Sequence, residues 1–494
     1  MSETHIPFKW RLPVIRLLSA VLLLTAAGLH LKNRPQEPEE YETRVIPPTC
    51  EDSGYTLYTS IHTGSTEVRN LVPALGHSFG DWETIRNGTA VEPQLQSRVC
   101  SVCRAEDQQA LYPELGIDRL TLNGDMDGIA KRDEVFPEAA FSGAQQSFTA
   151  FASAKYQGHS SLQYDKKNYT VKFFSDEDRK EKYRLTFSHW QPEHKYVLKA
   201  HYTDPSMCRN LVCADIWADM VSTRETVPQR LKELSNYGAV DGFPIALYIN
   251  DTFHGLYTMN LHKDERLFNL RDGAREAVMN INSADAPEAF FREEAVFDEE
   301  MPWEIERCAT EDTQWAQDHL NDLIRFVRTS DDLSFRRELS RYLDVDSAVD
   351  YVIAMYALGL QEHGAKDLVL VSYGEDAPWI CSMYDMEEAF DLDGGVCAPG
   401  EGDWDSGTGS LLWDRFLTHF YPEICSRYAQ LRQGVLDPDS LCSRVDAFVE
   451  RIPRSIYEAD AKTNGVSVHT PEQTQLIKEN IRQLIQQTDT VFFP

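Results

Sequence analysis

Acidic side chains flank two short apolar runs in the last third of the chain. Glu362 and Asp367 precede the first run, and Asp385 and Glu387 follow the second. Carboxylates at one end of a hairpin could hold Mg²⁺ against the phosphates of a nucleotide, while one of them takes the proton of an acceptor hydroxyl. The alternative interpretation of this cluster is an acidic surface patch.

A turn of small residues in the first half could contact the same phosphates. Gly158, Ser160 and Ser161 follow a strand-like run, and Lys167 and Lys172 come shortly after them. The backbone N–H groups of such a turn can donate to phosphate oxygens, and a lysine on the next strand adds a positive charge. The alternative is an ordinary hairpin with solvated lysines.

A third polar group surrounds a predicted helix start. Lys199 lies in the run 196–200, and Asp204 precedes a proline that suits the first helical position. The following helix, at 211–220, would present Arg209 toward a cleft. The alternative is that these residues cap the helix and form ion pairs.

Strands dominate the first part of residues 114–494, and helices dominate the second part. Strand-like runs occur at 119–122, 149–156, 169–174, 196–200 and 245–249. Helix-like runs occur at 313–329, 333–342, 345–360 and 470–488, with a strand pair at 368–372 and 379–382. We therefore expect an α+β domain with a strand-rich first lobe and a helical second lobe, the plan of a protein-kinase-like fold.

Charge and length restrict the class of partner. The chain has 494 residues and a formal net charge of −31. Such acidity argues against a nucleic-acid partner, because phosphates would be repelled over most of the surface. It is compatible with an ATP site, where a few lysines and Mg²⁺ reverse the sign locally.

The N-terminus has the pattern of an export segment. Lys9, Arg11 and Arg16 lead into a mostly apolar run at 17–31. We expect a signal or anchor segment at 1–34 and a polar linker at 35–45; an uncleaved anchor, a cleaved signal and a buried helix stay open. Positive charge is denser before the run, which predicts a membrane-anchored or secreted protein on the extracytoplasmic face.

Residues 46–112 form a predicted small β-rich module with four candidate metal ligands. Cys50, His77, Cys100 and Cys103 make up a set that zinc accepts. The alternatives are a disulfide within the Cys100–Cys103 pair or with Cys50, and free thiols. The phrase "ALGH-F-GxW" with these cysteines resembles a small repeated module of Gram-positive surface proteins, although an expected Cys-x-x-Cys pair is absent around 59–64.

Five blocks of the large domain occur in the order shared by a known family. The blocks read YQGHSSLQYDKKNYTVKF, KYVLKAHYTDPSMCRN, LYINDTFHGLYTMNLHKD, EHGAKDLVLVSY with WICSMYDMEEAFDLDGG, and SLLWDRFLTHFYPEICSRYAQLR. Together they resemble the CotH family of atypical protein kinases, related to spore coat protein H. The resemblance covers roughly residues 114–490. It implies transfer of the γ-phosphoryl group of ATP, with Mg²⁺, to Ser or Thr hydroxyls of a protein substrate.

The resemblance also implies roles for individual residues. Glu362 takes the place of the catalytic-loop Asp, and Lys366 matches the catalytic-loop Lys. Asp367 takes the place of a metal-binding Asn, and Asp385 matches a metal-binding Asp; Glu387 stands where a second Asp is common. Lys172 is the first candidate for the phosphate-contacting lysine, followed by Lys167 and Lys199, with Gly158, Ser160, Ser161 and Arg209 as further nucleotide contacts.

Three departures from the family pattern lie at the chemistry. Glu362 is one methylene longer than Asp, which displaces its carboxylate and can lower a rate on the order of 100-fold. Asp367 adds a negative charge beside the phosphates. Together with Glu387 in place of Asp, these changes leave open a catalytically inactive kinase-like scaffold at the cell surface. A metal-dependent hydrolase would need more ligands than these motifs supply.

Overall fold

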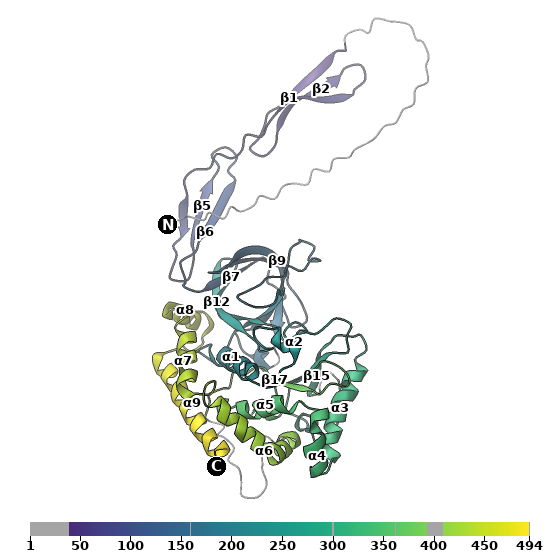
Figure 1. Cartoon of the computed structure of the whole chain (residues 1–494). Helices are drawn as coiled ribbons and strands as arrows, with labels where there is room; N and C mark the ends of the chain where they lie inside the picture. The colour runs from purple at the N-terminus through teal and green to yellow at the C-terminus, as the bar shows by residue number, and fades with distance from the viewer. Residues whose placement is uncertain (1–38, 159, 299–300, 361, 393–408, 494) are drawn as a thin grey trace, which may run out of the picture. The chain divides into compact units, whose positions relative to one another are not determined.

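The computed structural model describes residues 39–158, 160–298, 301–360, 362–392 and 409–493 (Figure 1). The predicted segment at 1–34 lies outside this part of the chain. Within the described ranges, no helix combines the length and the apolar character needed to cross a membrane. The chain divides into a small unit, residues 1–81 and 98–107, and a large unit, residues 82–97 and 108–494.

The small unit is built on an antiparallel sheet. Its strands are β1 (Tyr41–Ile46), β2 (Gly54–Ser60) and β3 (Thr66–Val72), with β2 in the middle. A second three-stranded sheet follows, with the order β4 (Glu83–Arg86), β5 (Gln94–Val99) and β6 (Glu106–Leu111). The division between the two units falls within β5 and β6.

Most of the second sheet belongs to the large unit. Residues 82–97 and 108–112 belong to that unit, although the sequence pattern groups them with the small module. The Tyr248 hydroxyl donates to the Val91 carbonyl, and the Glu92 carboxylate accepts from the Phe253 N–H at 3.2 Å. The ring of Tyr112 meets that of Tyr248 edge-on at 5.2 Å. These contacts attach this stretch to the β12–β13 hairpin.

The strand-rich first half of the large domain closes into a seven-stranded barrel. Its strands are β7 (Asp118–Asn123), β8 (Glu138–Ser142), β9 (Ser147–Gln157), β10 (Asn168–Phe174), β11 (Lys195–Lys199), β12 (Gly242–Ile249) and β13 (Thr252–Leu261). The order around the barrel is β10-β11-β13-β12-β7-β8-β9, and only β12 and β7 pair in parallel among the pairings described. Alternate residues of each strand point inward, as in Tyr196 and Leu198, and fill the interior.

A second sheet and the helices complete the large unit. The sheet order is β15 (Trp303–Cys308), β14 (Ala277–Ile281), β16 (Leu368–Ser372) and β17 (Ile380–Met383). The helices are α1 (Arg209–Ser222), α2 (Gln229–Lys232), α3 (Gln314–Thr329), α4 (Asp332–Glu338), α5 (Val345–Leu358), α6 (Leu411–Leu431), α7 (Pro438–Val449), α8 (Arg454–Asn464) and α9 (Pro471–Phe492). Figure 1 shows β15 and β17 between the barrel strands and helices α5 and α6 in this view.

Local sequence explains where the main helices begin. The Asp344 carboxylate accepts from the Ser347 N–H at 2.7 Å and caps α5, and Thr470 forms a capping box with Gln473 at the start of α9.

The strands and helices of the large unit confirm the predicted mixture of α and β structure. The two-lobed kinase-like arrangement stays a prediction, because the strand topology establishes a closed barrel and a separate four-stranded sheet.

Candidate functional site

The hairpin of β16 and β17 brings two predicted acids to one end. Leu368 pairs with Met383, so Asp367, just before β16, and Asp385, just after β17, both leave the sheet at this end. Both have a positive φ, 59° and 58°, which aspartate tolerates better than most residues. The Asp367 N–H donates to the Ile281 carbonyl at 2.8 Å, which ties it to the neighbouring strand β14.

Lys199, at the end of barrel strand β11, reaches this pair of turns. Its Nζ lies 2.8 Å from Asp385 Oδ1 and 3.4 Å from Glu387 Oε1, and the lysine is buried. Burial opposes its charge, but the two carboxylates outweigh burial and raise the Lys199 pKa well above its usual value. Burial likewise opposes the charge of Asp385, yet the lysine holds the pKa of that carboxyl below its usual value. The barrel and the hairpin thus share an ion pair that is buried on the lysine side and partly exposed on the carboxylate side.

His201, two residues beyond Lys199, faces the same carboxylates. Its Nε2 is 2.7 Å from the Thr258 hydroxyl, and its Nδ1 is 3.5 Å from Glu387 Oε1. Burial, followed by the charge of Lys199, lowers the pKa of His201 to about 3, so the ring is neutral at physiological pH. No hydrogen-bond partner for Nδ1 occurs among the described residues. A neutral imidazole therefore leaves a polar atom available beside Glu387.

Asp367 is the acid of the site that is least compensated by positive charge. Burial, followed by the charge of Asp385, raises the Asp367 pKa to about 7. The nearest cation is Lys366, whose Nζ is 3.6 Å from Asp367 Oδ2. An added divalent cation would relieve this repulsion between two carboxylates.

The predicted proton acceptor lies at the edge of the site. Glu362 belongs to a short 3₁₀ turn before β16, its side chain is 59% exposed, and its carboxylate accepts from Lys366 Nζ at 2.9 Å. Lys366 therefore contacts both Glu362 and Asp367. The two predicted catalytic residues, Glu362 and Lys366, are brought together, and Lys366 also lies beside the partly buried Asp367 carboxylate.

The predicted phosphate turn connects to Lys199 through Asn168. Gly158 has φ +114°, and a Cβ at this position would lie 2.0 Å from Ser161 Oγ, so the close turn requires glycine. The Asn168 amide donates to Ser161 Oγ at 3.2 Å and accepts from the Ala200 N–H at 2.7 Å. Ser160 opens the short 3₁₀ helix that follows the turn. Sequence reasoning missed the role of Asn168, which its place between Lys167 and Tyr169 in the family block could have suggested.

The other predicted lysines lie elsewhere. Lys172 Nζ donates to Glu134 Oε1 at 2.7 Å, and Lys167 donates to the carbonyls of Leu162, at 2.7 Å, and Tyr164. Neither has Asp385 among its contacts. Of the three candidate lysines, the structure brings only Lys199 to the acids.

Arg209 and its neighbour hold the segment after β17. Arg209 donates to the Ala389 carbonyl at 2.9 Å, and the Asn210 side-chain oxygen accepts from the Met386 N–H at 3.3 Å. The predicted helix start, with Pro205 at the first helical position, is wrong, because α1 begins at Arg209. The Asp204 carboxylate accepts from the Arg209 N–H at 3.0 Å within the turn that precedes the helix. Arg209 thus fixes the backbone that carries Asp385 and Glu387, and its predicted contact with a nucleotide has no support in these contacts.

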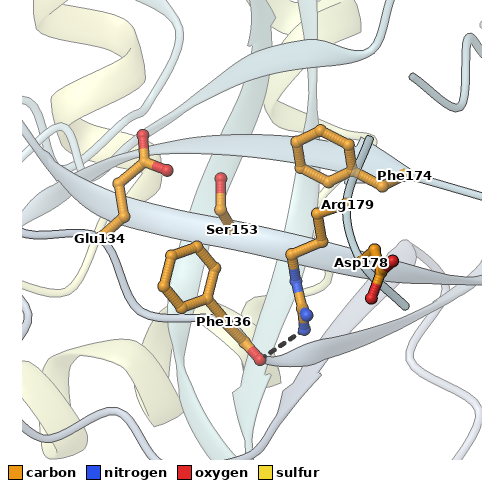
Figure 2. A pocket seen from close by; sticks show the side chains of 6 residues that line it. All are labelled: Glu134, Phe136, Ser153, Phe174, Asp178 and Arg179. Atoms are coloured by element: carbon orange, nitrogen blue, oxygen red, sulfur yellow. Dashed lines mark hydrogen bonds between the residues drawn. The ribbon is translucent and has the colours of Figure 1, made fainter. Parts of the chain in front are cut away.

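A shallow hollow of about 410 Å³ lies on the barrel, away from the acids, and is lined by Glu134, Phe136, Ser153, Phe174, Asp178 and Arg179 (Figure 2). Arg179 donates to the Ala152 carbonyl at 2.9 Å, the Glu177 carbonyl at 2.8 Å and the Phe136 carbonyl at 2.7 Å. Its guanidinium is therefore occupied, and two carboxylates border the hollow. This chemistry does not suit a phosphate, so we place the candidate site at Lys199 and the hairpin.

The two carboxylates at the hairpin suit Mg²⁺ that is also bound by water and phosphate, and they are too few for a site in which the protein supplies every ligand. Mg²⁺ usually binds through one or two carboxylates, several waters and substrate phosphates. Asp367 and Asp385 supply two carboxylates that repel each other, as the raised Asp367 pKa indicates. In the described part of the chain, no third protein ligand atom gathers with them. The remaining ligands would come from phosphate and water.

Comparison with known proteins gives the family of the chain. A search of curated proteins found no match to the chain. A protein family described as CotH kinase protein matches residues 154–489, a range that runs from barrel strand β9 to helix α9 and includes Lys199, Asp367 and Asp385. Because this match covers more than half of the sequence, the chain belongs to the CotH kinase protein family.

Proposed function

We propose that the chain transfers the γ-phosphoryl group of ATP to Ser or Thr hydroxyls of a protein, with Mg²⁺. The family membership supports a kinase-like protein. The observation that carries the proposal is the 2.8 Å contact between Lys199, on the barrel, and Asp385, after the hairpin. In phosphoryl-transfer sites a lysine contacts the phosphates while a nearby acid holds Mg²⁺ against them, and this contact places the two kinds of group side by side.

Each side chain has a role in this proposal. Lys199 binds phosphate oxygens, and Asn168 holds the Gly158 turn, whose N–H groups contact the same phosphates. Asp367 and Asp385 would hold Mg²⁺, which neutralises charge on the phosphates when bound.

The hydroxyl that is phosphorylated must lose a proton. Glu362 is exposed and accepts that proton, and Lys366, 2.9 Å away, offsets the charge that develops on the transferred group. An exposed carboxylate at the rim suits a protein substrate, because the acceptor chain can reach it without entering a deep pocket.

The test is titration calorimetry of ATP into the full chain, with and without Mg²⁺. We expect Mg²⁺-dependent binding that Asp385→Asn weakens at least tenfold. The matched control is Asp178→Asn, an exposed acid on the barrel, which leaves binding unchanged. Phosphate transfer to a mixture of generic acceptor proteins is then followed by mass spectrometry. Binding with no transfer to any acceptor or to the chain itself contradicts the kinase activity.

A second candidate function is a catalytically inactive, kinase-like binding domain. Lys199 is held by two carboxylates, and Asp367 places a third acid where phosphates would lie. If this charge excludes ATP, Asp367→Asn should create Mg²⁺-dependent binding that the natural chain lacks. That result would identify the natural chain as a scaffold.

We propose that either function is carried out outside the cytoplasm, on a membrane-anchored or secreted chain. The basic and apolar residues at 9–31 support this location. The test is protease treatment of intact cells that make the chain. Protection of the whole chain until the cells are lysed would contradict an extracytoplasmic location.

A further inference from the structure

Four sulfur and nitrogen ligands gather in the small unit, far along the chain from the kinase-like site. Cys50 follows β1, His77 follows β3, and Cys100 and Cys103 follow β5. Their ligand atoms all lie within 4.8 Å of one another. Cys50 Sγ is 3.9 Å from Cys100 Sγ, and Cys103 Sγ is 3.2 Å from His77 Nδ1.

These separations are close to the edges of a zinc tetrahedron. Zinc–sulfur bonds of about 2.3 Å and zinc–nitrogen bonds of about 2.0 Å place two sulfurs about 3.8 Å apart and a sulfur and a nitrogen about 3.5 Å apart. The pair Cys50–Cys100 and the pair Cys103–His77 differ from these values by a few tenths of an ångström. Small side-chain rotations would bring all four ligands to one centre.

The orientation of His77 also matches that of a metal ligand. While Nδ1 faces Cys103, Nε2 lies 3.4 Å from Glu51 Oε1. Metal-bound histidines usually donate their second ring N–H to a carboxylate or carbonyl, which fixes the ring. The ring also lies 5.1 Å from that of Phe79, which packs against its face.

The small unit needs a cross-link, because it has almost no apolar core. Of its described residues, only Cys50, Gly54, Ser60 and Cys100 are buried, while β3 is exposed along its whole length. Units of this size usually rely on disulfides or a metal when they cannot bury apolar surface. The two buried cysteines are therefore the centre of this fold.

A metal accounts for these contacts better than a disulfide. A disulfide between Cys50 and Cys100 would not explain why His77 and Cys103 gather at the same place. A disulfide between Cys100 and Cys103 would likewise not explain the position of Cys50 and His77. We infer that Cys50, Cys100, Cys103 and His77 Nδ1 bind a structural Zn²⁺, and that the three thiols release their protons when it binds.

The first test measures metal on the full chain. The protein is purified with reductant, stripped with EDTA, and loaded with ZnCl₂ or CoCl₂. We expect inductively coupled plasma mass spectrometry to find about one zinc per chain. The Co²⁺-loaded chain should show the intense visible absorption bands of tetrahedral thiolate coordination. Cys103→Ser and His77→Gln should weaken these bands, whereas Cys308→Ser, in the large unit, should leave them unchanged.

The second test separates a metal from a disulfide. The chain is purified without reductant, and its ten cysteines are alkylated in denaturant and counted by mass. Ten alkylated thiols together with bound zinc support the site. Two fewer alkylated thiols, mapped to Cys50, Cys100 or Cys103, with no bound zinc would overturn it. Proteolysis adds a readout that does not depend on the variants, since EDTA should speed cleavage within residues 46–81 only if a metal holds this unit together.

Discussion

Lys199 is the residue whose contacts most directly join the two halves of the site. Its charge is balanced by Asp385 and Glu387, and it would have to share that charge with incoming phosphates. We predict that Lys199→Met reduces Mg²⁺-dependent ATP affinity at least tenfold, measured by calorimetry. Lys199→Arg, which keeps the charge, should retain part of it.

The informative comparison is Lys172→Met on the same barrel. Lys172 pairs with Glu134 and has no contact with the hairpin, so its removal should leave ATP affinity unchanged. The opposite pattern, a loss of binding with Lys172→Met alone, would move the phosphate site to the outer barrel surface.

Asp264 gives the large unit a specific pH dependence. Burial, followed by repulsion from Glu193 and Glu265, raises its pKa to about 7, while Lys195 at 4.0 Å and the hydrogen bond from the Arg266 N–H compensate only in part. A carboxyl whose pKa is raised on folding stabilises the fold at low pH, and this stability is lost as pH rises through about 7.

We therefore predict that the stability of Asp264→Asn relative to the natural chain rises by on the order of 2 kcal/mol between pH 5 and pH 8.5. In the natural chain, the Arg266 N–H donates to Asp264 Oδ1 at 3.1 Å, and the side-chain oxygen of the asparagine can accept the same hydrogen bond. Thermal unfolding across this range measures the difference. A constant offset at all pH values would show that Asp264 does not titrate in this window.

At the scale of elements, Asn168 connects the Gly158 turn to the end of β11. Asn168→Asp keeps an acceptor for the Ala200 N–H but loses the donor to Ser161 Oγ. We predict that ATP affinity falls about tenfold, which corresponds to roughly 1.4 kcal/mol, because the new carboxylate repels phosphates bound at the turn. Unfolding midpoints within a few degrees of the natural chain would exclude a general loss of structure, and unchanged affinity would show that the turn does not contact phosphate.

The same elements show what the sequence could predict. The hairpin and its acids were predictable, because two apolar runs with polar ends are a local pattern. The choice between Lys172 and Lys199 was not, because both point out of the barrel, opposite Val171 and Leu198. Lys172 lies on β10 and Lys199 lies on β11. The strand that meets the hairpin is set by the pairing of β11 with β13, some 60 residues away, and a local sequence pattern does not predict such a pairing.

At the scale of the whole molecule, one buried ion pair ties the barrel to the C-terminal helices. Lys166 Nζ lies 2.9 Å from Asp460 Oδ2 on α8, and it also donates to the carbonyls of Ala200 and Leu256. Lys166→Met would leave the Asp460 carboxylate buried without its cation. We predict a loss of about 3–5 kcal/mol in the free energy of unfolding.

Urea denaturation followed by circular dichroism measures this loss, and Lys462→Met, on the same helix, is the control. A loss below about 1 kcal/mol would mean that water reaches Asp460. This ion pair could not be predicted from the sequence, because Lys166 and Asp460 are 294 positions apart and each resembles an ordinary surface charge. The division within β5 and β6 was missed for the same reason, since it depends on packing against the distant β12–β13 hairpin.

This long separation also orders the events of biosynthesis. A ribosome releases Lys166 long before Asp460, so for most of translation the lysine lacks its carboxylate partner. Until α8 has emerged, the end of the barrel beside Ala200 and Leu256 has no Asp460 to neutralise this amine. A chain that ends before residue 460 would therefore expose this end of the barrel, and cellular proteases could distinguish it from the finished protein.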